Sequence, residues 1–296
     1  MGKGIKKYMK EPLITVVIPV YNGEVYLRSC LHYILIQDYP NYEVIVVDNN
    51  STDNTKSIIT EISKKDKRVK YSFEPFLSRG AARNNGIACA KGKIISMTDV
   101  DCVVPTNWLR TLTHPLIYEN EKVVMGSQYD ITQSKLSTFV QLQQEKHLDR
   151  YIKGQYIDFL DTKNFASKTH IIKNIMFDKK QRTSEDFEFA LRIRGLHKIR
   201  FLKDVKVGHR HSKGILKWLL NTFEKGYWTR SVYMKYKNDP RVKNEIMFAT
   251  TKKGDLNNYI RESFRDLYNY PSKLAYFHFI TGLFWRAGMF WGYIRL

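Results

Sequence analysis

Short apolar runs alternate with amphipathic segments through the first hundred residues, and this alternation limits the fold more than any other feature. Four runs have the uninterrupted, β-branched pattern of buried strands: residues 13–20, 42–47, 69–73 and 93–97. Segments with helical spacing lie between them, at residues 24–36, around 58–62 and at 80–90. Strands that alternate with helices predict βαβ units, so we expect a mainly parallel sheet flanked by helices.

Beyond about residue 130 the pattern is mixed. The sequence predicts further strands at 123–128, 199–202 and 205–208, and helices at 134–153, 182–194 and 215–236. We therefore expect one α/β domain over residues 1–212, with halves at about 13–129 and 130–212. A helical, basic and aromatic extension over residues 213–296 would follow it.

Acidic residues come directly after two of the predicted strands. Asp48 ends one of them, and Asp99 and Asp101 follow another. Ligands of parallel α/β sheets bind at the carboxyl ends of the strands. Carboxylate oxygens suit Mg²⁺ or Mn²⁺ held together with phosphate oxygens, and such a cation neutralises a diphosphate leaving group. Taken alone, the Asp-x-Asp triplet is more often a solvated loop, so its position after an apolar strand gives it weight.

Three further groups of residues each have a functional and a structural interpretation. Gly80 to Ala82 could let the backbone approach a ligand, with Arg83 as a cation for phosphate, or they could simply pack a helix tightly. Glu185 and Asp186 could supply a general base, or favour a helix start. His209 and His211 could contribute a metal ligand, although partial burial is the favoured interpretation for His211.

Together these segments resemble the family-2 glycosyltransferases of the GT-A fold. The matching segments, in family order, are VVIPVYNGEVYLRSCL, VIVVDNNSTDNT, GAARNNGIACAKGKIISMTDVD, NIMFDKK and SEDFEFALRIRG. The resemblance implies a GT-A catalytic domain with a donor half and an acceptor half, and transfer of a hexosyl group from a nucleotide-sugar. It further implies a single displacement with inversion at the anomeric carbon, with a UDP-sugar as the favoured donor.

The resemblance also assigns roles to residues of this chain. It implies that the base and ribose of the donor contact Pro19, Tyr21, Asn22 and Asp48, with Arg83 nearby. Asp99 would contact ribose or metal-bound phosphate, and Asp101 would be the main ligand of Mn²⁺ or Mg²⁺. His209 would lie near the diphosphate as a further candidate metal ligand. Asp186 would be the catalytic base, and Glu185 would help to position it.

Two departures from the family pattern qualify these roles. The family commonly has Asp-Asp-Gly-Ser where this chain has Asp48, Asn49, Asn50 and Ser51, which puts base contacts by the second of these residues in doubt. The Gln-x-x-Arg-Trp signature of processive synthases does not follow Asp186. We therefore expect the enzyme to add one sugar per encounter.

The charge of +20 is unevenly distributed: +4 in residues 1–129 and +16 in residues 130–296. The last 24 residues are rich in Tyr, Trp and Phe but contain His278 and Arg286, which favours an in-plane anchor over a membrane span. We expect residues 213–296 to bind an anionic membrane surface and the acceptor to be lipid-linked or membrane-adjacent. Three cysteines without a pairing pattern suggest a reducing compartment, hence peripheral attachment at the cytoplasmic face.

Two other classes of protein remain open from the residues alone. A sugar nucleotidyltransferase would share the α/β domain and the acidic metal ligands, but it normally has a Gly-rich basic loop where this chain has Val20 to Gly23. A nucleic-acid-binding protein would explain the charge, but it leaves the acidic groups without a purpose. We therefore expect no nucleic-acid partner.

Overall fold

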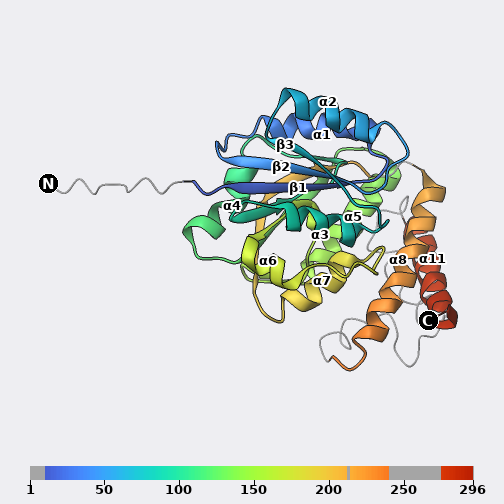
Figure 1. Cartoon of the computed structure of the whole chain (residues 1–296). Coiled ribbons are helices and arrows are strands. Elements are labelled where there is room, and N and C mark those ends of the chain that lie inside the picture. The colour runs from blue at the N-terminus through green and yellow to red at the C-terminus, as the bar shows by residue number, and fades with distance from the viewer. Residues whose placement is uncertain (1–10, 212–213, 240–274, 296) are drawn as a thin grey trace.

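The computed structural model describes residues 11–211, 214–239 and 275–295 (Figure 1). Its first strands, β1 (Ile14–Val20), β2 (Tyr42–Asp48), β3 (Val69–Phe73) and β4 (Ile94–Met97), are adjacent and parallel in the order β3-β2-β1-β4. Hydrophobic side chains on both faces of β1 and β2 are buried, which is the pattern of a parallel strand covered on two sides. The strands predicted for this half are confirmed.

The second half extends the same sheet. β9 (Phe165–Lys168) lies antiparallel between β4 and β6 (Val123–Asp130), and β10 (Ile199–His209) runs parallel to β6. Short strands complete the sheet at its edges: β5 (Cys102–Val103), β7 (Ile152–Lys153) and β8 (Tyr156–Ile157). Two strands were predicted over 199–208, but β10 is one strand whose pairing is irregular between Leu202 and Lys206.

Helices cover both faces of the sheet (Figure 1). On one face lie α1 (Glu24–Leu35), α2 (Thr55–Lys65) and α4 (Trp108–Tyr118), and on the other α3 (Arg79–Cys89), α6 (Thr169–Ile175) and α7 (Glu185–Ile193). Each layer buries its apolar stripe against the strands, with Leu31 and Ile59 on the first face and Ile87 and Phe189 on the second. The predicted α/β architecture, a mixed sheet between helices, is confirmed.

The small residues of α3 serve packing. A Cβ atom added at Gly86 would lie 2.3 Å from Val17 Cγ1, and one at Gly80 would lie 2.8 Å from the carbonyl oxygen of Asp178. Ala81 and Ala82 are completely buried. Of the two interpretations of this segment, the structure therefore favours a tightly packed helix over a backbone that approaches a ligand.

The C-terminal part consists of two paired helices, α8 (Ile215–Lys235) and α11 (Ala275–Arg295), which lie side by side in Figure 1. Glycines allow the close approach: a Cβ atom at Gly226 would lie 2.0 Å from the Trp285 carbonyl oxygen, and one at Gly288 would lie 1.9 Å from that of Phe223. The start of α8 packs Trp218 against Phe139 of α5 (Lys135–Asp149). None of the described helices is long and apolar enough to cross a membrane.

Candidate active site

The loops that follow β1 and β2 hold each other through Asn22. Asn22 has a positive φ of 49°, and its side-chain oxygen accepts a hydrogen bond from the Thr52 backbone N–H at 2.8 Å. Its own backbone N–H donates to Ser51 Oγ at 3.0 Å. Tyr21, the preceding residue, is half exposed at the same strand end. Asn22 thus fixes the loops, while Tyr21 offers an open ring surface.

Asp48 and Asn49 are turned into the protein. The Asp48 carboxylate is 2% exposed and accepts hydrogen bonds from the Ser51 backbone N–H at 2.9 Å and the Tyr71 hydroxyl at 3.3 Å. The Asn49 amide is fully used by the backbone of residues 74–78, at distances of 2.7 to 3.1 Å. Asn49 therefore has no free side-chain N–H for a nucleobase, and Asp48 shapes the loop. Contact of Pro19 and Asp48 with a donor remains a prediction.

Arg83 links two of the predicted acidic groups. Its guanidinium donates to Glu185 Oε1 at 2.6 Å and to Asp99 Oδ1 at 3.0 Å, and it lies over the Phe177 ring. Arg83 is 2% exposed and Glu185 is 3% exposed. Arg83 was expected to offer its charge to phosphate. In the structure that charge is paired with two carboxylates, as burial of a charge requires, and contact of Arg83 with donor phosphate remains a prediction.

Asp101 and His209 meet because β5 pairs antiparallel with β10, which places His209 opposite Cys102. His209 Nε2 lies 3.4 Å from Asp101 Oδ2, and the Asp101 carbonyl accepts from the Arg210 backbone N–H. Burial alone would raise the pKa of Asp101, but the hydrogen bond and charge of His209 hold that pKa below its usual range. His211 is 8% exposed beside Gln141, so the favoured interpretation of a partly buried histidine holds.

Asp186 lies in the first turn of α7. Its surroundings raise its pKa, whereas those of Asp101 lower the pKa of that residue. Burial, followed by the negative charges of Glu185 and Asp161, raises the pKa of Asp186 to about 6. The preceding residue, Ser184, has a left-handed backbone with φ 58°. A carboxylate with a pKa near the working pH is suited to accept a proton in a reaction.

A buried ion pair that the sequence gave no reason to select lies among these acids. Lys163 Nζ is 2.8 Å from Asp161 Oδ1, and the two side chains are 18% and 10% exposed. Burial opposes the charge of Lys163, but Asp161 and next Asp99 raise its pKa above the usual range. The segment Asp161 to Asn164 has no periodicity or motif, so only the fold reveals that it supplies a cation to the acidic cluster.

Helix α8 brings one more cation to this site. Loss of water around the ammonium, followed by the positive charges of Lys163 and Arg79, lowers the pKa of Lys225. The negative charges of Asp186 and Asp161 oppose this shift. The Lys225 side chain is exposed to solvent. The basic and aromatic pattern of residues 215–236 predicts membrane contact and gives no local signal for a role of Lys225 beside Asp186.

The site also fits a divalent cation in part. Within the described residues, no cluster of three or more His, Cys, Asp or Glu side chains could hold a metal ion unaided. Asp101 Oδ2 and His209 Nε2 nevertheless lie 3.4 Å apart, so an oxygen and a nitrogen meet there. The other ring nitrogen, buried His209 Nδ1, has no hydrogen-bond partner among the described residues. Mg²⁺ and Mn²⁺ commonly take one or two protein ligands and fill the remainder with phosphate oxygens and water.

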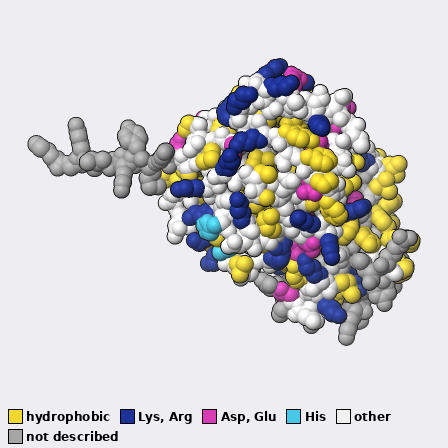
Figure 2. Space-filling model, in the orientation of Figure 1, with side chains coloured by type: hydrophobic (Ala, Val, Ile, Leu, Met, Phe, Trp, Pro, Cys, Tyr) yellow, Lys and Arg dark blue, Asp and Glu magenta, His cyan; other side chains and the backbone are white. Residues whose placement is uncertain are grey.

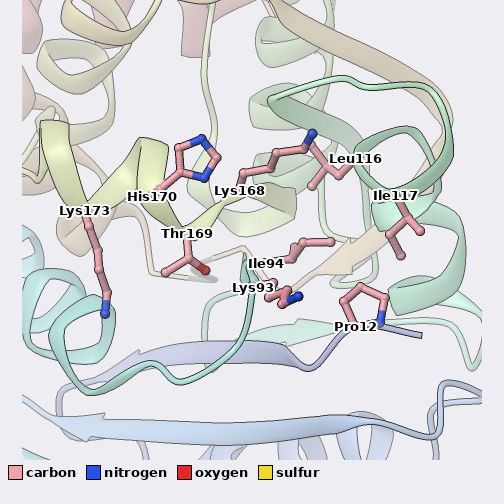
Figure 3. Close-up of a pocket in the computed structure, with 9 residues that line it drawn as sticks. All are labelled: Pro12, Lys93, Ile94, Leu116, Ile117, Lys168, Thr169, His170 and Lys173. Carbon is pink, nitrogen blue, oxygen red and sulfur yellow. The ribbon is translucent and has the colours of Figure 1, made fainter. Parts of the chain in front are cut away.

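A separate cavity lies at the opposite end of the parallel strands (Figure 3). Its volume is about 770 Å³, and it is lined by Pro12, Lys93, Ile94, Leu116, Ile117, Lys168, Thr169, His170 and Lys173. None of the predicted site residues is among them. This cavity is therefore distinct from the acidic site, which lies where β1, β2 and β4 end.

Comparison with known proteins identifies the family of this chain. The family model described as glycosyl transferase family 2 matches residues 15–180, more than half of the chain. An uncharacterized glycosyltransferase of Haemophilus influenzae is 30% identical over 255 residues, which cover 81% of this chain and 95% of that protein. The chain spans less than half the length of several other curated glycosyltransferases that it matches.

A curated relative and a solved structure add context. The Campylobacter jejuni enzyme GalNAc(5)-diNAcBac-PP-undecaprenol beta-1,3-glucosyltransferase is 34% identical over 103 residues, 34% of this chain and 33% of that enzyme. The mannosyltransferase PcManGT of Pyrobaculum calidifontis, solved with GDP-Man and Mn²⁺, shares the fold with a TM-score of 0.71 at 16% identity, over 96% of this chain and 88% of that one. The fold is GT-A, and the chain is a glycosyltransferase that belongs to glycosyl transferase family 2.

Proposed function

We propose that this enzyme transfers a hexosyl group from a nucleoside-diphosphate sugar to an acceptor hydroxyl by single displacement with inversion. The observation that carries the proposal is the ion-pair chain from Asp99 through Arg83 to Glu185. It links the acids that follow β4 to the residue beside Asp186. A donor held at the strand ends would thus have a base of raised pKa fixed relative to it.

The chain's own residues supply the proton transfer. Asp186 accepts the proton of the acceptor hydroxyl as that oxygen forms a bond to the anomeric carbon. The bond between the anomeric carbon and the diphosphate oxygen breaks, and the nucleoside diphosphate leaves with the electron pair. Arg83 and Glu185 do not touch the reacting atoms in this proposal; they hold Asp99 and α7 in place.

Asp101 and His209 would hold the divalent cation, with Asp99 beside them on donor ribose or phosphate. When bound, Mn²⁺ or Mg²⁺ supplies neutralisation of the diphosphate charge. A UDP-sugar is our favoured donor because of the family resemblance. The GDP-Man complex of PcManGT makes GDP the nucleotide to compare with it.

Thermal unfolding with nucleotides tests the donor site. We expect one of UDP, GDP, dTDP or CDP to raise the Tm in the presence of Mn²⁺, because a ligand at 100 times its Kd stabilises the folded state by about 2.7 kcal/mol. Asp101→Asn should abolish the Mn²⁺-dependent part of this shift, while Asp149→Asn, an exposed carboxyl, should leave it intact. A full shift in Asp101→Asn would rule out Asp101 as the metal ligand.

The C-terminal helices support a membrane-adjacent acceptor. Leu283, Phe290, Trp291 and Ile294 of α11 are each more than one-third exposed, and their spacing places them on one side of the helix. The opposite side packs Gly288 against α8. Figure 2 shows hydrophobic side chains at the edge of the molecule where α8 and α11 lie. We therefore propose residues 213–296, of which 240–274 lie outside the described residues, as a peripheral membrane-binding extension, with a lipid-linked acceptor like that named for the Campylobacter relative.

Flotation with vesicles tests this surface. The wild-type protein should float with vesicles that contain anionic phosphatidylglycerol, and Phe290→Ser/Ile294→Ser should lose at least about tenfold in bound fraction, since each large apolar side chain contributes about 1.5–3 kcal/mol when buried. Leu196→Ser removes an equally exposed apolar side chain elsewhere and should float normally. Equal flotation of all three proteins would contradict the proposed surface.

A further inference from the structure

Helix α7, which carries the proposed base Asp186, is held by α8. Helix α8 lies beyond residues 15–180, the region that the family model matches. α8 runs beside the segment that leads into α7 and contacts it at two points. Gln181 Nε2 donates to the Trp228 carbonyl oxygen at 2.9 Å, and the hydroxyls of Ser184 and Thr229 lie 3.5 Å apart. The second contact falls on the left-handed residue just before Glu185. The backbone that aims Asp186 is therefore in direct contact with α8.

The strongest link between the two helices is a buried carboxylate, Glu188. It is completely buried and accepts hydrogen bonds from Lys235 Nζ at 2.8 Å and the Tyr236 hydroxyl at 2.6 Å. Arg192, one turn further along α7, donates to it as well, at 2.7 Å. Burial alone would raise the pKa of Glu188, but these three donors hold it below the usual range. A buried carboxylate with this many donors fixes the position of its helix.

Lys235 also contacts the residue that precedes the segment 179–184, which leads into α7. Its ammonium also lies 2.8 Å from Asp178 Oδ2, so one side chain joins the residues on both sides of the 179–184 segment. Val232, completely buried, packs in the same region with Leu191 of α7. Because α7 has only nine residues, its position depends on such packing rather than on its own stability.

We propose that Lys235 and Tyr236 are positioning residues of the transfer reaction, which act through Glu188 and Asp178 to hold α7 so that Asp186 points at the acceptor hydroxyl. α8 is then part of the catalytic apparatus as well as of the membrane-binding extension. This inference rests on the proposed role of Asp186 as the base. It does not depend on the identity of the donor or on membrane binding.

The test compares Lys235→Met, Tyr236→Phe and the double variant with wild type. Lys237→Met is the matched control, because it removes an exposed lysine two residues away. Nucleotide release from UDP-glucose, UDP-galactose, UDP-GlcNAc and GDP-mannose, with water as acceptor, gives kcat and KM. We expect the double variant to lose about tenfold or more in kcat, since displacements of about 1 Å can cost 100-fold, with KM for the donor within about twofold. Lys235→Arg, which keeps the charge, should recover most of the rate.

Two further readouts separate positioning from a general loss of folded protein. The pH midpoint of the rate should move in the double variant, whereas partial unfolding lowers the rate at every pH without moving the midpoint. Hydrogen exchange of the backbone amides of residues 184–193 should accelerate in the double variant and not in Lys237→Met.

The outcomes are distinguishable. An active wild type together with a double variant that matches Lys237→Met in kcat, pH midpoint and exchange would overturn the positioning role alone. A wild type that releases nucleotide from none of the four donors would overturn the proposed function, and with it the role of Asp186.

Discussion

Replacing Asp186 by Asn is expected to lower kcat by about 10²–10⁴, because general-base assistance contributes rate factors of that size. The substitution keeps the shape of the side chain and removes its ability to take a proton. Binding of the nucleoside diphosphate with Mn²⁺ should be retained, since Asp186 lies on α7 and not at the ends of β1, β2 and β4. Nucleotide release at saturating donor measures the loss in kcat, and the thermal shift measures whether nucleotide binding is retained.

The pH dependence of the rate is a second measure of the same residue. Burial and the charges of Glu185 and Asp161 raise the pKa of Asp186 to about 6, and the base is active only as the carboxylate. The rate should therefore rise as the pH increases through about 6 and level off above 7. Asp149→Asn, at an exposed position, should show the wild-type rate and profile. Near-normal turnover by Asp186→Asn would exclude it as the base.

Replacing Arg83 by Met should have the largest effect on stability. The change leaves the carboxylate of Glu185, 3% exposed, without its cation, and it also unpairs Asp99. Removal of one partner from a buried pair costs about 3–5 kcal/mol, so urea unfolding should show a loss of that size. Arg28→Met removes a solvent-exposed pair with Glu61 and should change stability far less.

A double variant identifies the cause of that loss. Arg83→Met/Glu185→Gln removes the buried negative charge together with its partner, so it should recover part of the stability that Arg83→Met loses. If Arg83→Met unfolds within about 1 kcal/mol of wild type, the ion pair does not hold the site together. Activity should fall in both variants, because Asp99 and Glu185 lose the residue that links them.

Local features of the sequence were sufficient for the strands and helices of the first half. The run from Tyr42 to Val47 is apolar and β-branched, and it forms β2 because such a run is stable where helices cover both faces. Asp48, Asp99 and Asp101 were selected because they follow strands, and parallel topology brings such positions to one edge. The irregular pairing within β10 was missed, since an interruption at residues 203–204 resembles a turn when only the sequence is considered.

The sequence by itself determined the α/β class, the family and the acidic positions, because these depend on periodicity and on short motifs. Only the tertiary structure decided what those positions contact. Arg83 meets a carboxylate 102 residues away and another 16 residues away, and Lys163 reaches the same cluster from a segment without a motif. Glu188 is bound from α8 across 47 residues. Such contacts depend on how the chain crosses the sheet and returns, and no local pattern encodes that path.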